Sequence, residues 1–175
     1  MRTKLFIIML FINTIILGYS VYAQNENSSK CDDAIYVKTD AYEGIIWGIN
    51  CPENIIDDKN YRWVPTEEDI KIAEKLIKEY IVKRVKEKGL LNQQYDDKTP
   101  IIHLNLDKYY RQYLGYKDEQ WKKIIFVKCF WKEKEALFPY WKHKQIAIFD
   151  GGSYYWSIFV DMERKVCFDF FVHGG

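Results

Sequence analysis

The sequence has few residues of the types that hold metals or carry redox chemistry. Its three histidines, His103, His143 and His173, are scattered, so no HxH or HExxH pair is available to hold zinc. Its four cysteines include no CxxC pair, which argues against a thioredoxin-type redox motif and against a zinc knuckle. We therefore predict no metal site, no cofactor and no recognisable catalytic residues.

The chain also lacks an excess of charge of either sign. It has 26 basic and 25 acidic residues, interspersed along its length. Surfaces that bind nucleic acid or anionic lipid need clustered positive charge. This balance argues against a nucleic-acid partner and against a polybasic membrane surface. No internal repeat is present.

The most apolar stretch of the chain lies at its start and covers only residues 5–17. Arg2 and Lys4 precede an apolar stretch over residues 5–17, and small residues then lead to Ala23. This order is typical of a secretory signal peptide, and the run is short for a membrane span. We expect a signal peptide over residues 1–23, a polar tail over 24–30, and an exported protein, periplasmic or secreted, with no stable membrane span after cleavage.

The remainder, residues 31–175, has the length of a single domain. Its clearest element is a helix over residues 66–88. Thr66 and Asp69 fit a capping box, and Gly89 suits a left-handed stop. Apolar residues recur on one face at helical spacing, so this face should cover a sheet.

Six short segments have the composition of β-strands. They are residues 34–37, 44–49, 109–116, 123–131, 154–160 and 166–172. Together with the helix they predict an α+β fold, in which one long amphipathic helix packs on a curved antiparallel sheet of four or more strands. In the last strand, alternation predicts that Val166, Phe168, Phe170 and Val172 share one face, opposite Cys167, Asp169, Phe171 and His173.

The cysteine count is even, which suggests disulfides in an exported protein. Cys31 and Cys51 are the pair that we expect to be bridged, because they close a short loop. Cys129 and Cys167 would pair by elimination, but in a simple meander one strand lies between them, and a bridge would not reach. Either the strand order differs, or these two cysteines do not pair with each other.

Aromatic residues are abundant, with 6 Trp, 14 Tyr and 10 Phe. Strand alternation gives a sheet face that mixes aromatic and polar groups. We predict that this face binds a ligand, with the site formed by Tyr109, Arg111, Tyr113, Tyr155 and Phe159. Tyrosine rings and an arginine suit a glycan or the side chains of an envelope protein. The alternative is that the N-terminal segment, with Trp47 and Trp63, covers this face as a second core layer.

Three sequence stretches support a resemblance. They are the tyrosine-rich Lys108-Tyr-Tyr-Arg-Gln-Tyr-Leu-Gly-Tyr116, Phe149-Asp-Gly-Gly-Ser-Tyr-Tyr-Trp156, and Phe168-Asp-Phe-Phe-Val-His-Gly174. With the preceding long helix, residues 65–175 resemble the cystatin-like α+β arrangement and small exported bacterial proteins of uncharacterised function. The resemblance implies a fold but no chemistry, and the chain lacks the Gln-x-Val-x-Gly loop of cystatin protease inhibitors.

Three classes of function follow from these features. The first is a non-catalytic binding or interaction module of the cell envelope or exterior, which we favour. The second is a secreted inhibitor-like or immunity-like protein, which a protruding loop such as 132–145 would favour. The third is a small hydrolase with an unrecognised site, for which a deep pocket with carboxylates or a Cys–His contact would speak.

Overall fold

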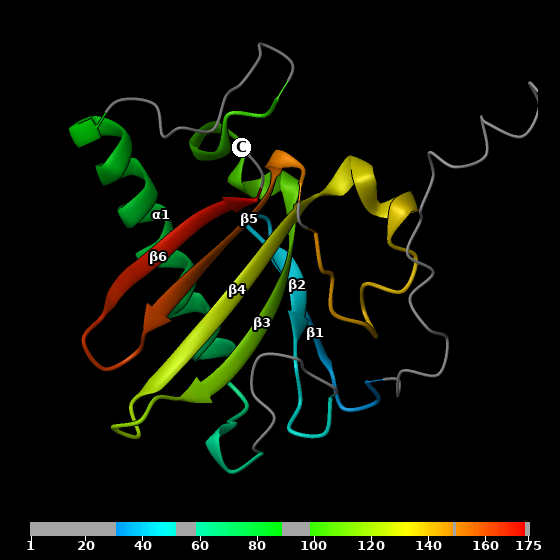
Figure 1. Cartoon of the computed structure of the whole chain (residues 1–175), viewed down its shortest axis with the longest axis vertical. Helices are drawn as coiled ribbons and strands as arrows, with labels where there is room; N and C mark the ends of the chain where they lie inside the picture. The colour runs from blue at the N-terminus through cyan, green and yellow to red at the C-terminus, as the bar shows by residue number, and fades with distance from the viewer. Residues whose placement is uncertain (1–30, 52–58, 89–98, 149, 174–175) are drawn as a thin grey trace, which may run out of the picture.

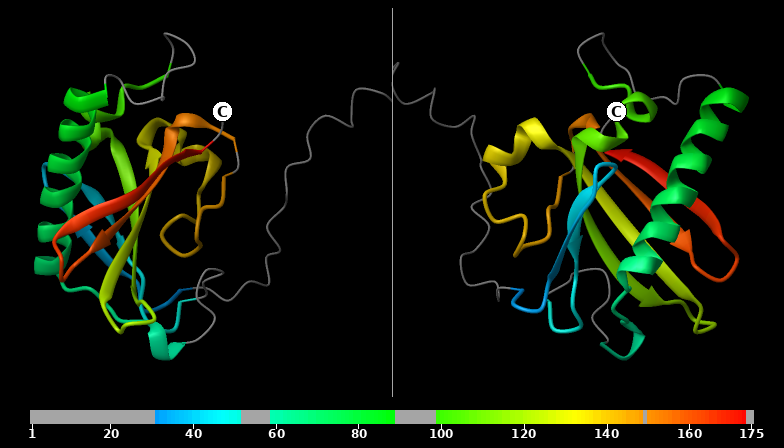
Figure 2. Two further views of the ribbon diagram at one scale, coloured as in Figure 1. Left: turned by 60° about the vertical axis from the view of Figure 1, so that its left-hand side comes forward. Right: turned by 180° about the vertical axis from the view of Figure 1, so that it is seen from behind.

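A computed structural model describes residues 31–51, 59–88, 99–148 and 150–173. One long helix, α1 (Glu67–Lys88), lies diagonally across one face of a six-stranded sheet (Figures 1 and 2). On the opposite face lies a segment of short 3-10 helix and turns, residues 132–148, which we call the cover segment (Figure 2). The sheet is therefore the middle of three layers, and it has an apolar core on each side.

The strands follow one another across the sheet in chain order, from β1 to β6. Their bounds are β1 Ile35–Lys38, β2 Glu43–Ile46, β3 Tyr109–Lys117, β4 Lys123–Trp131, β5 Gly152–Asp161 and β6 Val166–His173. The predicted α+β class, with one long helix on a sheet, is confirmed, and each predicted strand overlaps an observed one.

Helix α1 spans Glu67–Lys88, one residue inside the expected start. Thr66 caps it: its Oγ1 accepts a hydrogen bond from the Asp69 backbone N–H, and the Asp69 carboxylate accepts one from the Thr66 N–H. This reciprocal pairing is the predicted capping box. The buried face of the helix consists of Ile70, Ala73, Ile77 and Ile81.

The sheet is mixed, so the expectation of a purely antiparallel sheet is wrong at one place. Strands β2 and β3 pair in parallel, with Glu43 opposite Tyr110 and Ile46 opposite Tyr113. The other four strand pairs are antiparallel. The reason is the position of α1 between β2 and β3 in the chain. A crossing helix returns the chain to the edge where it began, so the next strand runs in the same direction.

Strand β6 does not alternate as predicted, because a bulge interrupts it. Cys167 lies opposite Val160 and Phe168 opposite Phe159, but the register then shifts before Phe171 pairs with Ser157. Asp169 has a φ of 46°, a left-handed conformation that Asp adopts more readily than most residues. Cys167 therefore packs on the helix side of the sheet.

The second sheet face is covered by the cover segment together with part of the N-terminal region. Phe138, Trp141, Ile146 and Ile148 of this segment join the core on that side. From the N-terminal region Trp47 also joins it, whereas Trp63 packs with the helix-side core. The expected N-terminal cover is thus correct for Trp47 and its neighbours Cys31, Ile45 and Cys51 but not for Trp63, and residues 132–148 share the layer with them.

Cys31 and Cys51 form a disulfide, with Cα atoms 4.4 Å apart, as predicted. Cys129 and Cys167 are both free. Strand β5 lies between their strands, as in the simple meander, so the geometric objection to their pairing is confirmed.

Burial raises the pKa of the Cys167 thiol to about 12 and also that of Cys129 above its ordinary value. Both thiols are therefore protonated and unreactive at neutral pH.

We expect alkylation of the unreduced, denatured protein to label two cysteines, Cys129 and Cys167, and alkylation after reduction to label four. Mass spectrometry of tryptic peptides reads this directly. A Cys31→Ser/Cys51→Ser variant should lose about 3 kcal/mol of unfolding free energy, because the unfolded chain is no longer cross-linked. Cys167→Ser serves as the control without a bridge. Four labelled cysteines before reduction would contradict the pairing.

None of the helices in the described ranges combines the length and the apolar character needed to cross a membrane. The predicted signal peptide and polar tail, residues 1–30, lie outside the described residues, so these two assignments stay predictions.

Candidate functional site

The structure divides the five predicted ligand-binding residues between the two sheet faces. Tyr109, Arg111 and Tyr113 are at most 1% exposed and lie beneath α1. Tyr155 and Phe159 lie on the opposite face, within the second core. The expected common open face is therefore wrong, because alternation along β3 turns all three of its residues toward the helix.

Arg111 serves to join the sheet to the helix. Its Nε lies 3.0 Å from Glu74 Oε1 and its second terminal nitrogen 3.2 Å from Oε2, a two-point ion pair with α1. The Tyr113 hydroxyl donates to the same carboxylate at 2.8 Å. Burial opposes the charge of Arg111, but the Glu74 carboxylate keeps its pKa above the ordinary value. The arginine is satisfied internally and is not exposed to a ligand.

Gln112, the next residue of β3, fixes the cover segment to the other face. Its side-chain NH₂ donates to the carbonyls of Trp141 and Lys144, at 2.6 and 2.8 Å. Its side-chain oxygen accepts from the Ile146 N–H at 2.9 Å. Gln112 is 2% exposed, so its one side-chain amide pairs three backbone hydrogen-bonding groups away from solvent. This clamp holds the part of the cover segment that ends at Ile146.

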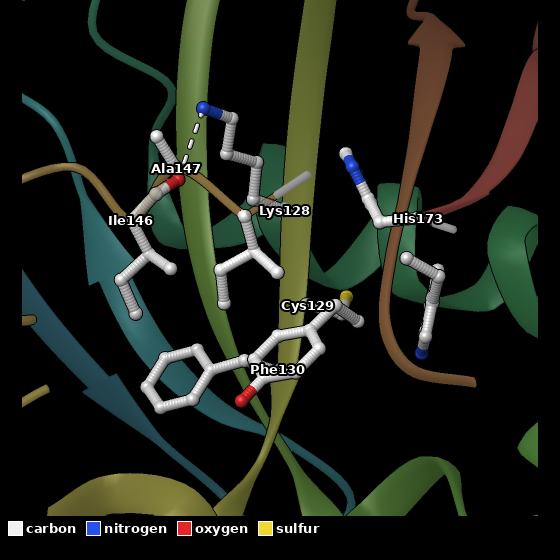
Figure 3. A pocket seen from close by; sticks show the side chains of 9 residues that line it. Lys128, Cys129, Phe130, Ile146, Ala147 and His173 are labelled. Atoms are coloured by element: carbon white, nitrogen blue, oxygen red, sulfur yellow. Dashed lines mark hydrogen bonds between the residues drawn. The ribbon is translucent and has the colours of Figure 1, made fainter. Parts of the chain in front are cut away.

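A pocket of about 170 Å³ lies between the sheet and the end of the cover segment (Figure 3). One side is formed by β4 and β5, the other by residues 146–148, and His173 of β6 closes one flank. The walls are largely apolar. The lining residues are Lys128, Cys129, Phe130, Ile146, Ala147, Ile148, Tyr155, Trp156 and His173.

Two basic side chains lie at this pocket, and both contact the backbone of the cover segment. The Lys128 ammonium donates to the Ile146 carbonyl at 3.2 Å, the bond drawn in Figure 3, and it also lies over the Phe126 ring. The His173 ring lies beside the backbone of Ile148. Burial, and then the nearby Lys128 charge, lower the pKa of His173 by more than this backbone contact raises it. The imidazole is therefore mostly neutral at pH 7, and Lys128 supplies the positive charge.

Tyr155 is the predicted site residue that lines the pocket. Its side chain is 8% exposed and packs edge-on against Phe138 of the cover segment. Within the described residues its hydroxyl has no hydrogen-bond partner. Burial raises its pKa, so the hydroxyl is a donor at all physiological pH values. The hydroxyl is not among the described side-chain atoms that are both fully buried and unpaired, so it is open to the pocket, where solvent or a bound molecule serves as its partner.

Gly151 fixes where the Tyr155 ring lies. A Cβ at this position would overlap the ring carbons of Tyr155, so only glycine lets the turn before β5 pass so closely over the ring. The turn therefore helps to hold the ring in its place at the pocket.

Among the described residues, one group of potential metal ligands lies close together. Atoms of Cys31, Asp33 and Cys51 fall within 4.8 Å of one another. Both sulfur atoms are used in the disulfide, so we assign no metal to this group.

Sequence reasoning missed Gln112 and Lys128. Both are polar residues inside apolar strands, and that interruption was the available signal. It could mark the residues as unusual, but it could not identify their partners, because those lie 18 to 34 positions further along the chain.

No family model, curated protein or solved structure matches the chain. The resemblance to the cystatin-like arrangement and to small exported proteins therefore stays a prediction. What the described residues do show is a mixed-sheet α+β domain with a largely apolar pocket between its sheet and the cover segment.

Proposed function

We propose that this protein is an exported, non-catalytic binding module that holds a small ligand in the pocket between the sheet and residues 146–148. The observation that carries the proposal is the largely apolar pocket of about 170 Å³, onto which the Tyr155 hydroxyl opens with no partner among the described residues. Apolar walls with a few polar groups are the usual form of a small-molecule site. Export is supported by the predicted signal peptide and by the Cys31–Cys51 disulfide.

A glycan or an envelope protein was the partner expected from an open tyrosine face. Tyr109 and Tyr113 are fully buried, so that surface is not available. An inhibitor-like function would be favoured by a protruding loop at 132–145. That segment is instead anchored by Gln112 and packed through Trp141. The geometry therefore favours a ligand enclosed in the pocket over a loop of this protein that enters the active site of an enzyme.

Hydrolysis is the second candidate, and one contact favours it. His173 Nε2 lies 3.2 Å from Ser157 Oγ, within the reach of a general base that would take the hydroxyl proton. Ser157 is, however, 4% exposed and lies in the middle of β5. The amides beside it belong to a strand that pairs on both sides, so they are poorly placed to form an oxyanion hole. We therefore rank binding above catalysis.

We expect a fragment screen by ligand-observed NMR to yield small apolar compounds that bind the wild type and fail to bind an Ile148→Trp variant, whose larger ring fills the pocket. Ile49→Trp is the matched control, because Ile49 is exposed and distant in sequence from the lining residues. Fragments that bind both variants equally, or a screen with no binders, would refute the proposed site. Covalent labelling of Ser157 by a fluorophosphonate would favour the hydrolase instead.

A further inference from the structure

We propose that the ligand of this pocket is a small organic carboxylate whose apolar body is about the size of one aromatic ring. This inference rests on the proposed function, because it names the class of molecule that the same pocket holds. It is argued from three properties of the lining: its hydrogen-bonding character, its charge and its volume.

The side-chain groups that line the pocket favour an acceptor. The Tyr155 hydroxyl and the Lys128 ammonium are both hydrogen-bond donors. No carboxylate is found among the described lining residues. A ligand with acceptor oxygens would give the Tyr155 hydroxyl, which opens onto the pocket, a partner that the described residues do not provide, whereas a ligand with only donors would not match Lys128.

The charge of the lining selects an anion over a cation. Lys128 carries a positive charge next to the pocket, and its field already depresses the pKa of His173. An organic ammonium in the same place would meet this charge in a partly dry setting, where like charges repel strongly. A carboxylate would instead form charge-assisted hydrogen bonds there.

The volume and the walls set the size of the apolar part. The pocket measures about 170 Å³. An apolar cavity of about 150 Å³ is enough to hold benzene, so one ring or a short branched chain fits here together with a carboxylate. Phe130, Ile146 and Ile148 provide apolar surface for such a body.

The test compares three probes of nearly equal shape by isothermal titration calorimetry: phenylacetate, phenylacetamide and phenethylamine. We expect phenylacetate to bind the wild type at least about tenfold more tightly than the amide, and phenethylamine not to bind. Lys128→Met should weaken phenylacetate binding by about tenfold or more, since a charge-assisted bond is lost. Lys123→Met, on the same strand but outside the pocket lining, should change it by less than about twofold.

Tyr155→Phe provides a second variant in case Lys128→Met loosens the cover segment. It removes one hydroxyl and keeps the ring, so the fold should be retained while phenylacetate binding weakens about threefold or more. Thermal unfolding of each variant checks the fold. Equal binding of the amide and the acid, binding of the amine, or no effect of either variant would overturn the carboxylate assignment.

These outcomes are separable from a failure of the proposed function. If none of the three probes binds but neutral fragments bind in an Ile148→Trp-sensitive way, the pocket is a binding site and the carboxylate inference is wrong. If neither the probes nor the fragments bind, both proposals are wrong.

Discussion

Replacing Glu74 by alanine is expected to lower the free energy of unfolding by about 3–5 kcal/mol, because it leaves the charge of Arg111 buried without its partner. Arg111 is 1% exposed and Glu74 is 12% exposed at the side chain, so solvent cannot replace the lost carboxylate. Urea unfolding followed by circular dichroism measures the change, with the slope compared between variants.

Two further variants separate the ion pair from its surroundings. Tyr113→Phe removes the third member of the network and should cost about 1.5–3 kcal/mol, the usual value of one hydrogen bond to a charged group. The double variant Glu74→Leu/Arg111→Met removes both charges and should regain most of the loss, since well-packed apolar side chains often replace a buried pair. If Glu74→Ala costs less than about 1 kcal/mol, the pair does not hold α1 to the sheet.

The second large effect is expected at the Gln112 clamp. Gln112→Met keeps the length of the side chain but leaves two carbonyls and one N–H of the cover segment unpaired. Because each buried unpaired group costs about 1–3 kcal/mol, we expect a loss of about 3 kcal/mol. We also expect the amides of residues 141–146 to exchange hydrogen faster in the variant than in the wild type, while those of β4 stay unchanged, which hydrogen-exchange mass spectrometry measures.

Gln120→Met is the matched control for this clamp. Gln120 lies exposed in the turn between β3 and β4, where its side-chain oxygen contacts only Lys122. The same substitution there should change the unfolding free energy by less than about 0.5 kcal/mol. Equal exchange rates in wild type and Gln112→Met would show that apolar packing alone holds the cover segment in place.

The binding and clamp predictions are linked, because the clamped segment also forms one wall of the pocket. The Ile146 carbonyl accepts a hydrogen bond from the Lys128 ammonium, and the Ile146 N–H donates one to the Gln112 side-chain oxygen. Loosening the clamp should therefore weaken binding of any pocket ligand even though Gln112 does not line the pocket.

The sequence by itself determined the local structure of this protein. The helix over 66–88 was predicted with its cap, because Thr66 and Asp69 satisfy the first turn from within that turn. Strands β3 to β6 were predicted too, and in the structure β3 pairs with β4 and β5 with β6, in each case its neighbour in the chain. The Cys31–Cys51 bridge followed from the short loop between the two cysteines.

Only the tertiary structure decided how distant segments meet. Alternation along β3 separates Arg111 from Gln112, but it does not say which residue faces the helix; that depends on which layer covers each face of the sheet. The parallel β2–β3 pair and the bulge at Asp169 depend on pairing between strands. The pocket forms where the cover segment folds back on β4. Such contacts join residues far apart in the chain, so they cannot be predicted from local hydrophobic pattern or secondary-structure propensity.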